Sequence, residues 1–112
     1  MYFTYNEMKC PCCGIAISDP EFLMVMDNIR EEVGKPLTIN SWYRCEKHDK
    51  ELGGKGAHTT GRAADIKCLT SGDRYDILRA AYGEGVKRIG VGKTFIHLDL
   101  VDDYPQEMAW VY

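Results

Sequence analysis

The chain has 112 residues, with 14 Lys and Arg against 17 Asp and Glu, which gives a formal net charge of −3 at pH 7. Apolar residues make up 45% and charged residues 28%, the balance of an ordinary globular protein. This composition excludes a disordered or collagen-like chain, and the length favours one domain over residues 1–112. The slight acidity gives no electrostatic basis for nucleic-acid binding.

Neither a membrane span nor an export signal is expected from the sequence. No stretch approaches the roughly 18 apolar residues that a membrane span needs. The first residues, Met1–Glu7, lack the basic and apolar regions of a signal peptide. The chain has five cysteines, an odd count that excludes complete disulfide pairing within one chain. We therefore expect synthesis in the cytoplasm, so that any action at the cell wall follows a separate release.

The first half of the chain predicts a helix, a strand, a short helix and a loop. Ser18 is followed three residues later by a glutamate, as in a capping box, with a proline in the first turn. Apolar residues then recur at helical spacing up to Gly34, which predicts the helix end. Residues 37–43 are rich in β-branched and aromatic side chains and indicate a strand. A helical stretch over 46–52 leads into the glycine-rich loop 53–61.

The second half predicts three strands and a helix. Residues 63–69 have the pattern of a buried strand, and a helix follows over 71–83. Strands over 87–91 and 94–101 are joined by Gly92-Lys93, a plausible hairpin turn. The complete order predicts a small α+β domain, with a mostly antiparallel sheet and flanking helices.

Two of the three histidines lie in contexts that suggest chemistry. A lone histidine is more often a surface or hydrogen-bonded core residue than a metal ligand. His58, however, lies at the end of the loop, and Asp65 lies on the strand that follows. Gly61 between them allows a tight backbone turn. An imidazole nitrogen and a carboxylate oxygen can then meet at one zinc ion.

The other context is the predicted strand that contains His97 and Asp99. Strand alternation places these two side chains on one face and the apolar Ile96, Leu98 and Leu100 on the other. Burying two ionisable groups side by side is costly unless both have partners. An exposed edge strand with a polar outer face is the alternative, but the apolar neighbours favour a central strand.

Five short motifs follow one another along the chain. They are Ser41-Trp42-Tyr43-Arg44, His48-Asp49, Gly53-Gly54, His58…Gly61…Ala63…Asp65 and Phe95-Ile96-His97-Leu98-Asp99. This ordered set resembles the zinc D-Ala-D-Ala carboxypeptidases of the M15 peptidase class, and in particular their small phage and prophage members. The resemblance covers about residues 8–112 and implies the hedgehog/DD-peptidase fold.

The resemblance implies a set of zinc ligands and an oxyanion-stabilising arginine. His58, Asp65 and His97 match the three ligands of one catalytic zinc ion, which leaves a fourth position open for water. Arg44 matches the arginine that holds the substrate carbonyl oxygen and stabilises the developing oxyanion. A surface salt bridge is the alternative role for this arginine.

Two further assignments rest on the same resemblance. Asp99 is the candidate general base, because His97-Leu98-Asp99 matches the His-x-Asp form of the small phage-type relatives. Many other relatives instead carry an acid three residues before the last zinc histidine, where this chain has Thr94. Asp99 can instead orient a zinc ligand or Arg44. Trp42 replaces a glycine usual in relatives. It can wall a substrate groove, although a core position is commoner for an aromatic residue.

The cysteines allow a second site. Cys10, Cys12 and Cys13 have metal-site spacing, and Cys45 can approach them if the N-terminal segment packs against the strand before it. A structural zinc ion or a disulfide would then fix the N-terminus. The alternative, which we favour from sequence, is a group of reduced, partly buried thiols. Cys68 is expected to be a small core residue.

The expected function is therefore a zinc metallopeptidase that cuts peptidoglycan stem peptides or cross-links, as a D,D-carboxypeptidase or an endopeptidase. The expected setting is a monomeric phage endolysin, released to the cell wall through a pore made by another protein. A second hypothesis is a catalytically inactive, zinc-stabilised module that binds the cell wall or a protein, as the similar hedgehog signalling domains suggest. A third is a structural domain with incidental histidines.

Overall fold

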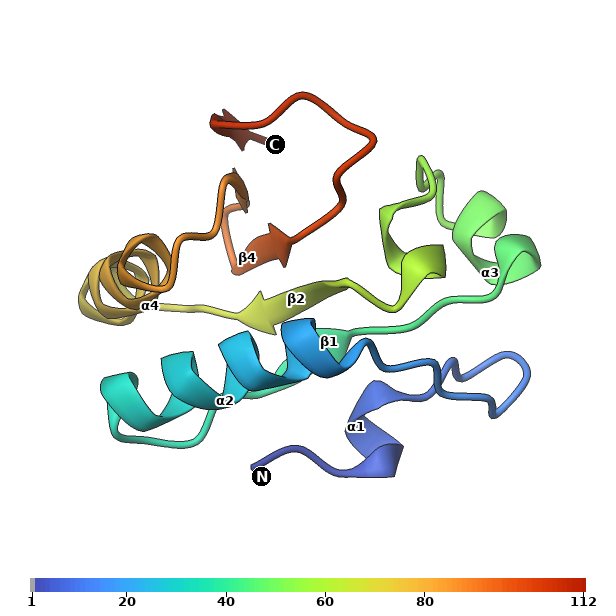
Figure 1. Ribbon diagram of the computed structural model, residues 1–112, viewed down its shortest axis with the longest axis horizontal. Coiled ribbons are helices and arrows are strands. Elements are labelled where there is room, and N and C mark those ends of the chain that lie inside the picture. Colours follow the sequence, from blue (N-terminus) through green and yellow to red (C-terminus); the bar gives the residue numbers. More distant parts are fainter. Residues whose placement is uncertain (1) are drawn as a thin grey trace.

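The structure, a computed structural model, describes residues 2–112 as short helices packed around one sheet (Figure 1). None of its described helices has the length and the apolar run that crossing a bilayer requires. The elements follow in the order α1 (Tyr5–Met8), α2 (Pro20–Val33), β1 (Ile39–Ser41), α3 (Glu46–Glu51), the 3₁₀ helix η1 (Ala57–Thr60), β2 (Ala63–Lys67), α4 (Ser71–Gly83), β3 (Arg88–Val91), β4 (Phe95–Asp99) and β5 (Met108–Val111).

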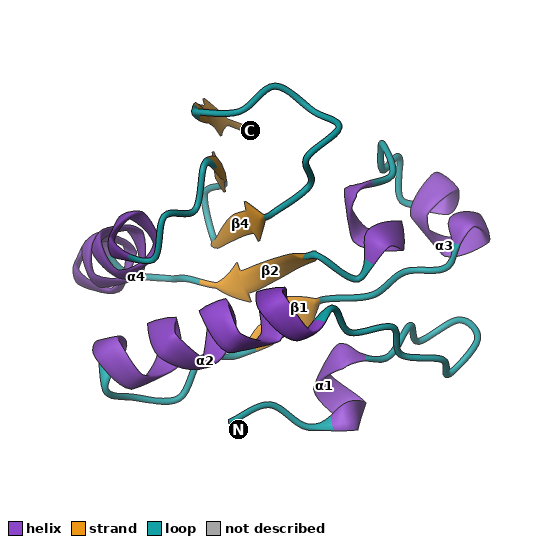
Figure 2. Cartoon of the chain, in the orientation of Figure 1, coloured by secondary structure: helices purple, strands orange, loops and turns teal. Residues whose placement is uncertain are grey.

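The sheet has the strand order β1-β2-β4-β3-β5. Every neighbouring pair is antiparallel except β3 and β5, which run parallel. The hairpin expected at Gly92-Lys93 joins β3 to β4, with the Gly92 N–H donating to the Phe95 carbonyl oxygen at 2.8 Å. The prediction of an α+β fold with a mostly antiparallel sheet is confirmed (Figure 2).

Helices α2 and α4 pack against each other and share a core with the sheet. Phe22 and Met26 of α2 are completely buried there, together with Ile66 of β2 and Ile96 and Leu98 of β4. The two strands thus direct their apolar side chains to the helices. Because strand side chains alternate, the polar residues between them point to the opposite face of the sheet, where the candidate site lies.

The start of α2 differs by one residue from the prediction. Asp19, and not Ser18, is the N-cap, and its Oδ2 accepts a hydrogen bond from the Phe22 N–H at 2.9 Å. Pro20 takes the first helical position, and a residue before proline is held in extended backbone, which is the conformation an N-cap needs. The predicted end is confirmed, since Gly34 is the C-cap with φ of +79°.

All four predicted strands are shorter in the structure, although the strand predicted over 87–91 loses only its first residue. Only three residues of the segment 37–43 pair, because the register of β1 against β2 shifts between Ile39 and Ser41 and the chain then leaves the sheet. The predicted strands 63–69 and 94–101 end at the last residues of β2 and β4. After β1, the chain therefore leaves the sheet and leads through Arg44 to α3.

Three elements were missed from sequence. Helix α1 begins with a complete capping box between Thr4 and Glu7, a signal that the sequence did contain. The predicted loop 53–61 includes η1, which starts after Gly56 with φ of +102°. Strand β5 pairs with β3 far back in the chain, and such non-local pairing leaves little local signal.

The cap of α2 gives a stability prediction. Asp19→Ala removes the acceptor for the Phe22 N–H, and we expect it to lower the free energy of unfolding by about 0.5–2 kcal/mol in urea denaturation. Ser18→Ala is the matched control, because the buried Ser18 hydroxyl makes no hydrogen bond within the described residues. A larger loss of unfolding free energy in Ser18→Ala than in Asp19→Ala would show that Ser18 caps the helix.

Candidate metal centre

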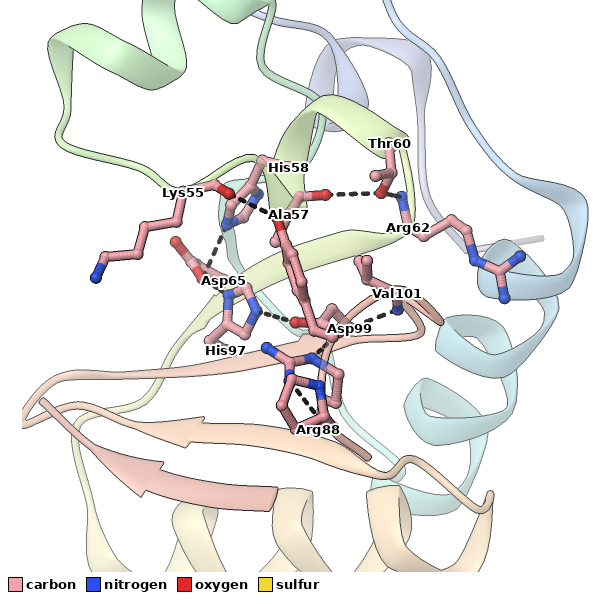
Figure 3. A network of polar contacts seen from close by, with 12 residues as sticks. Lys55, Ala57, His58, Thr60, Arg62, Asp65, Arg88, His97, Asp99 and Val101 are labelled. Atoms are coloured by element: carbon pink, nitrogen blue, oxygen red, sulfur yellow. Dashed lines mark hydrogen bonds and ion pairs between the residues drawn. The ribbon is translucent and has the colours of Figure 1, made fainter. Parts of the chain in front are cut away.

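The three side chains expected as metal ligands come together on the polar face of the sheet. Asp65 of β2 and His97 of β4 are direct cross-strand partners, and His58 lies on η1, just before β2. One ligand atom from each of the three lies within 4.8 Å of the other two. Figure 3 shows Asp65 lying between the two imidazole rings. His58 and His97, which are 39 residues apart in the sequence, thus share one site.

The contacts single out one nitrogen of each imidazole. His97 Nδ1 lies 2.9 Å from Asp65 Oδ1, and His58 Nε2 lies 3.4 Å from the same oxygen. The ring centroids of the two histidines are 5.2 Å apart. Both histidine side chains are buried, which removes water as their alternative partner. The atoms that face the centre are therefore two imidazole nitrogens and a carboxylate oxygen.

The proton on His58 is placed by a backbone carbonyl. His58 Nδ1 lies 2.7 Å from the carbonyl oxygen of Trp42. A carbonyl oxygen only accepts hydrogen bonds, so Nδ1 carries the hydrogen and donates it. In the neutral ring, the lone pair is then on Nε2, the nitrogen that faces Asp65.

The proton on His97 is placed by a carboxylate on the other side of the ring. His97 Nε2 lies 2.7 Å from Asp99 Oδ2. The second oxygen of Asp99 accepts from the Arg88 Nε–H at 2.8 Å and from the Val101 N–H at 3.1 Å. Asp99 is thus held by three partners, and it fixes the His97 hydrogen on Nε2. In the neutral ring the lone pair is on Nδ1, which faces Asp65 (Figure 3).

This donor set fits a zinc ion. Zinc favours two imidazoles and a carboxylate in sites that keep one position open. Two lone pairs directed at a carboxylate oxygen repel one another unless a cation or a proton lies between them. Both imidazoles also have their other nitrogen fixed by an acceptor, which is usual for metal-ligating histidines. The residues present therefore match the ion that the sequence motifs imply.

Burial and hydrogen bonding have opposite effects on the pKa values in this site. Burial by itself would lower the pKa of His97, but hydrogen bonds to Asp65 and Asp99 outweigh it and raise that pKa above its ordinary value. Burial would likewise raise the pKa of Asp65, yet the hydrogen bonds from His58 and His97 hold it well below its usual range. The carboxylates of Asp65 and Asp99 therefore favour a positive charge at this position.

Arg44 lies in the same site and is held from three sides. Its NH2 group lies 3.2 Å from Asp65 Oδ2, its NH1 group 3.1 Å from Asp49 Oδ1, and its Nε donates to Ser41 Oγ at 2.9 Å. The side chain is only 12% exposed, so the alternative of a surface salt bridge does not describe it. Two of the five guanidinium hydrogens are left for another acceptor.

The glycine-rich loop closes around Asp49, the partner of Arg44. Asp49 Oδ2 accepts from the Gly56 N–H at 3.0 Å. A Cβ atom on Gly54 would lie 2.1 Å from Asp49 Oδ1, so no side chain fits at that position. The expected loop therefore supports the arginine through this buried carboxylate.

Trp42 does not wall the groove. Its side chain is 1% exposed and packs edge-on against Phe3 and Phe22, with ring centroids 5.3 and 5.2 Å away. The role of substrate-groove wall is therefore wrong for this ring, and the core alternative applies. The backbone of Trp42 still contributes, because its carbonyl oxygen orients His58.

The site opens into a groove of about 570 Å³ that sequence reasoning located only in part. Trp110 and Tyr112 of the C-terminal segment line one side, and the Trp110 ring lies 5.6 Å from that of His97. Trp110 reaches this position because Gly90 lies beside it, where a Cβ would come within 2.5 Å of the indole nitrogen. Arg88 of β3, the cross-strand partner of Asp99, was also missed. Its only signal in the sequence was its polar character on a predicted strand.

The cysteines form a separate group. The sulfurs of Cys10, Cys13 and Cys45 lie within 4.8 Å of one another, while Cys12 is exposed beside them. Cys68 is buried in the core, as expected. All five are free thiols in the structure.

One comparison with known proteins bears on these observations. The family model described as Peptidase M15 matches residues 1–99, which include all three residues of the candidate metal centre and Arg44. A comparison with curated proteins found no match.

The contacts of Asp99 give a prediction about metal affinity. In Asp99→Asn, the amide oxygen can accept the hydrogen bond from His97, but the NH₂ group then faces the Arg88 and Val101 donors. Donors that face one another repel, so the His97 ring loses its fixed orientation. We expect the zinc dissociation constant to rise about 10- to 100-fold, measured by competition with a chromophoric chelator. Asp103→Asn, at an exposed carboxylate nearby, is the control. Unchanged zinc affinity with lost peptidase activity would instead make Asp99 the base.

Proposed function

The chain belongs to the peptidase M15 family, and on that premise we propose that it is a zinc metallopeptidase acting on peptidoglycan stem peptides or their cross-links. Family membership by itself makes it a peptidase of the metallopeptidase class. The zinc ion, the substrate and the roles of single residues are parts of the proposal.

The observation that carries the proposal is the pair of opposite imidazole orientations. His58 presents Nε2 and His97 presents Nδ1 to the same oxygen of Asp65, and a separate acceptor holds the hydrogen on the far side of each ring. Such an arrangement serves a metal better than a hydrogen-bond network, because both lone pairs point at an anion. We therefore assign His58, Asp65 and His97 as the ligands.

The reaction would take place in the groove beside these ligands. Zinc in such a site supplies Lewis-acid polarisation of a carbonyl and a water whose pKa is lowered to about 7. Arg44, with two hydrogens left to donate, would hold the scissile carbonyl oxygen and stabilise the negative charge that develops on it. The Arg44 charge cannot swing away, because Asp49 and Asp65 fix it on both sides.

Asp99 has the contacts of a positioning residue. Its side chain is fully buried, and it approaches His97 on Nε2, the side of the ring away from Asp65. A base for the attacking water must reach the water on the Nδ1 side. Of the two roles open to Asp99 from sequence, orienting the ligand His97 is the one that its contacts support.

The biological setting extends the proposal. The resemblance to small phage and prophage members supports an endolysin, working as a monomer of one domain over residues 1–112 and released to the cell wall. The aromatic side of the groove, formed by Trp110 and Tyr112, offers a flat surface for the aliphatic part of a stem peptide. Carboxypeptidase and endopeptidase action differ only in whether the substrate continues beyond the cut bond.

One observation favours a second candidate, a zinc-stabilised binding module. The carboxylates that line the groove among the described residues are Asp49, Asp65 and Asp99, and all three already have partners. A free general base is therefore not evident among them. A module that binds the peptide without cutting it would need no base.

The test is a peptidase assay on the zinc-loaded full chain. Purified peptidoglycan and synthetic stem peptides are the substrates, and mass spectrometry identifies the products. We expect cleavage that a chelator abolishes and added zinc restores, and that falls to background in His58→Ala and His97→Ala. His48→Ala is the matched control, because this third histidine lies on α3, outside the ligand set. It should retain full activity.

The other results separate the alternatives. Zinc binding and peptidoglycan binding without any cleavage would support the binding module and contradict the peptidase. Failure of the purified chain to bind zinc would contradict both.

A further inference from the structure

The N-terminal cysteines lie in a closed loop. In the segment Cys10-Pro11-Cys12-Cys13-Gly14, the Cys10 N–H donates to the Ile15 carbonyl oxygen at 2.8 Å and the Gly14 N–H donates to the Cys10 carbonyl oxygen at 2.8 Å. Gly14 has φ of +72°, which a glycine adopts without strain. These bonds turn the chain tightly enough to direct the sulfurs of Cys10 and Cys13 to the same side.

A third sulfur belongs to a residue distant in the sequence. Cys45 follows β1, and its sulfur lies 3.7 Å from that of Cys10. Zinc–sulfur bonds of about 2.3 Å at tetrahedral angles place two sulfurs about 3.8 Å apart. The sulfurs of Cys10, Cys13 and Cys45 all lie within 4.8 Å of one another, as ligands of one ion require. Cys45 is also the N-cap of α3, but its side chain makes no capping hydrogen bond.

The backbone around Cys10 is arranged for a sulfur that carries charge. Burial by itself would raise the pKa of the Cys10 thiol, but N–H groups of Cys45, Cys13 and Cys12 donate to it and lower the pKa to about 7. Several N–H groups directed at one sulfur stabilise a thiolate, the form that binds metals.

We propose that Cys10, Cys13 and Cys45 bind a structural Zn²⁺ ion, separate from the candidate catalytic centre. Cys12 is exposed outside this group of three, and its thiol interacts with that of Cys45. Thiolate-rich tetrahedral sites select zinc over harder divalent ions such as magnesium or calcium. Binding releases the protons of the ligating thiols to solvent and involves no change of oxidation state.

The proposed ion would join the N-terminal segment to the chain that follows β1, two segments that already lie in contact. The N-terminal loop lies beside the chain that leads from β1 to α3 (Figure 1), and the Tyr43 N–H donates to the Met8 carbonyl oxygen at 3.0 Å. Arg44 directly precedes Cys45, and Asp49, which holds Arg44, lies on the helix that Cys45 begins. The zinc ion bound by these thiolates would thus fix the backbone that carries Arg44.

Cobalt substitution tests this inference independently of peptidase activity. Co²⁺ bound to cysteine thiolates gives intense sulfur-to-metal charge-transfer absorption in the near ultraviolet, whereas Co²⁺ bound to two imidazoles and a carboxylate does not. We expect this band in the full chain, kept reduced and loaded with Co²⁺. It should persist in His58→Ala, which lacks a ligand of the other centre, and disappear in Cys13→Ser. Zinc analysis should give two ions per chain, and one in either variant.

Two controls guard against a trivial result. Cys13 is exposed, so its replacement by serine should leave the fold intact, which circular dichroism and retention of the other zinc ion would verify. Cys68→Ala removes a thiol outside the group and should keep the band. Absence of the band from the reduced full chain overturns the proposal. A Cys10–Cys45 disulfide that forms in chain refolded with zinc present also overturns it.

Discussion

The structure depends on one arrangement, a carboxylate held between two imidazoles on the polar face of the sheet. Asp65 lies 2.9 Å from His97 and 3.4 Å from His58, and all three are largely removed from water. Charged and polar groups in such a position are unfavourable unless each has a partner of the right sign. A divalent cation satisfies all three at once. The carbonyl of Trp42 and the carboxylate of Asp99 then hold the outer nitrogens, so the site is already oriented before the ion binds.

The fold supplies this arrangement through register and through small residues. Antiparallel pairing of β2 and β4 places Asp65 directly opposite His97, with their apolar neighbours directed to the helices. His58 reaches the same point because Gly61 turns the chain into β2, and a Cβ there would lie 2.6 Å from the carbonyl oxygen of Ile17. Gly90 has a comparable effect on β3, since its missing side chain lets Trp110 approach His97. The chemistry thus rests on backbone positions that the core holds rigid.

Local signals were sufficient to predict much of this from sequence. The alternation around His97 and Asp99 placed both on one face, and the histidine, glycine and aspartate spacing from residue 58 to 65 brought the second group of donors to it. Long-range features were not predictable in the same way. A core position for the Trp42 ring was open from sequence, but nothing near it indicates that its carbonyl orients a histidine. The parallel pairing of β5 depends on residues about 20 positions away, as the partners Arg88 and Met108 show. Of the partners of Asp99, Arg88 likewise comes from another strand, whereas His97 and Val101 lie two residues away in the sequence.

The central claim is that the two imidazoles bind one ion through different nitrogens. Nitrogen-15 NMR of the histidine side chains in the zinc-bound chain tests it most directly, because the chemical shifts distinguish protonated from metal-bound ring nitrogens. The account predicts that His58 is protonated at Nδ1 and bound through Nε2, and that His97 is protonated at Nε2 and bound through Nδ1. Both rings bound through the same type of nitrogen, or neither ring perturbed by zinc, would contradict it.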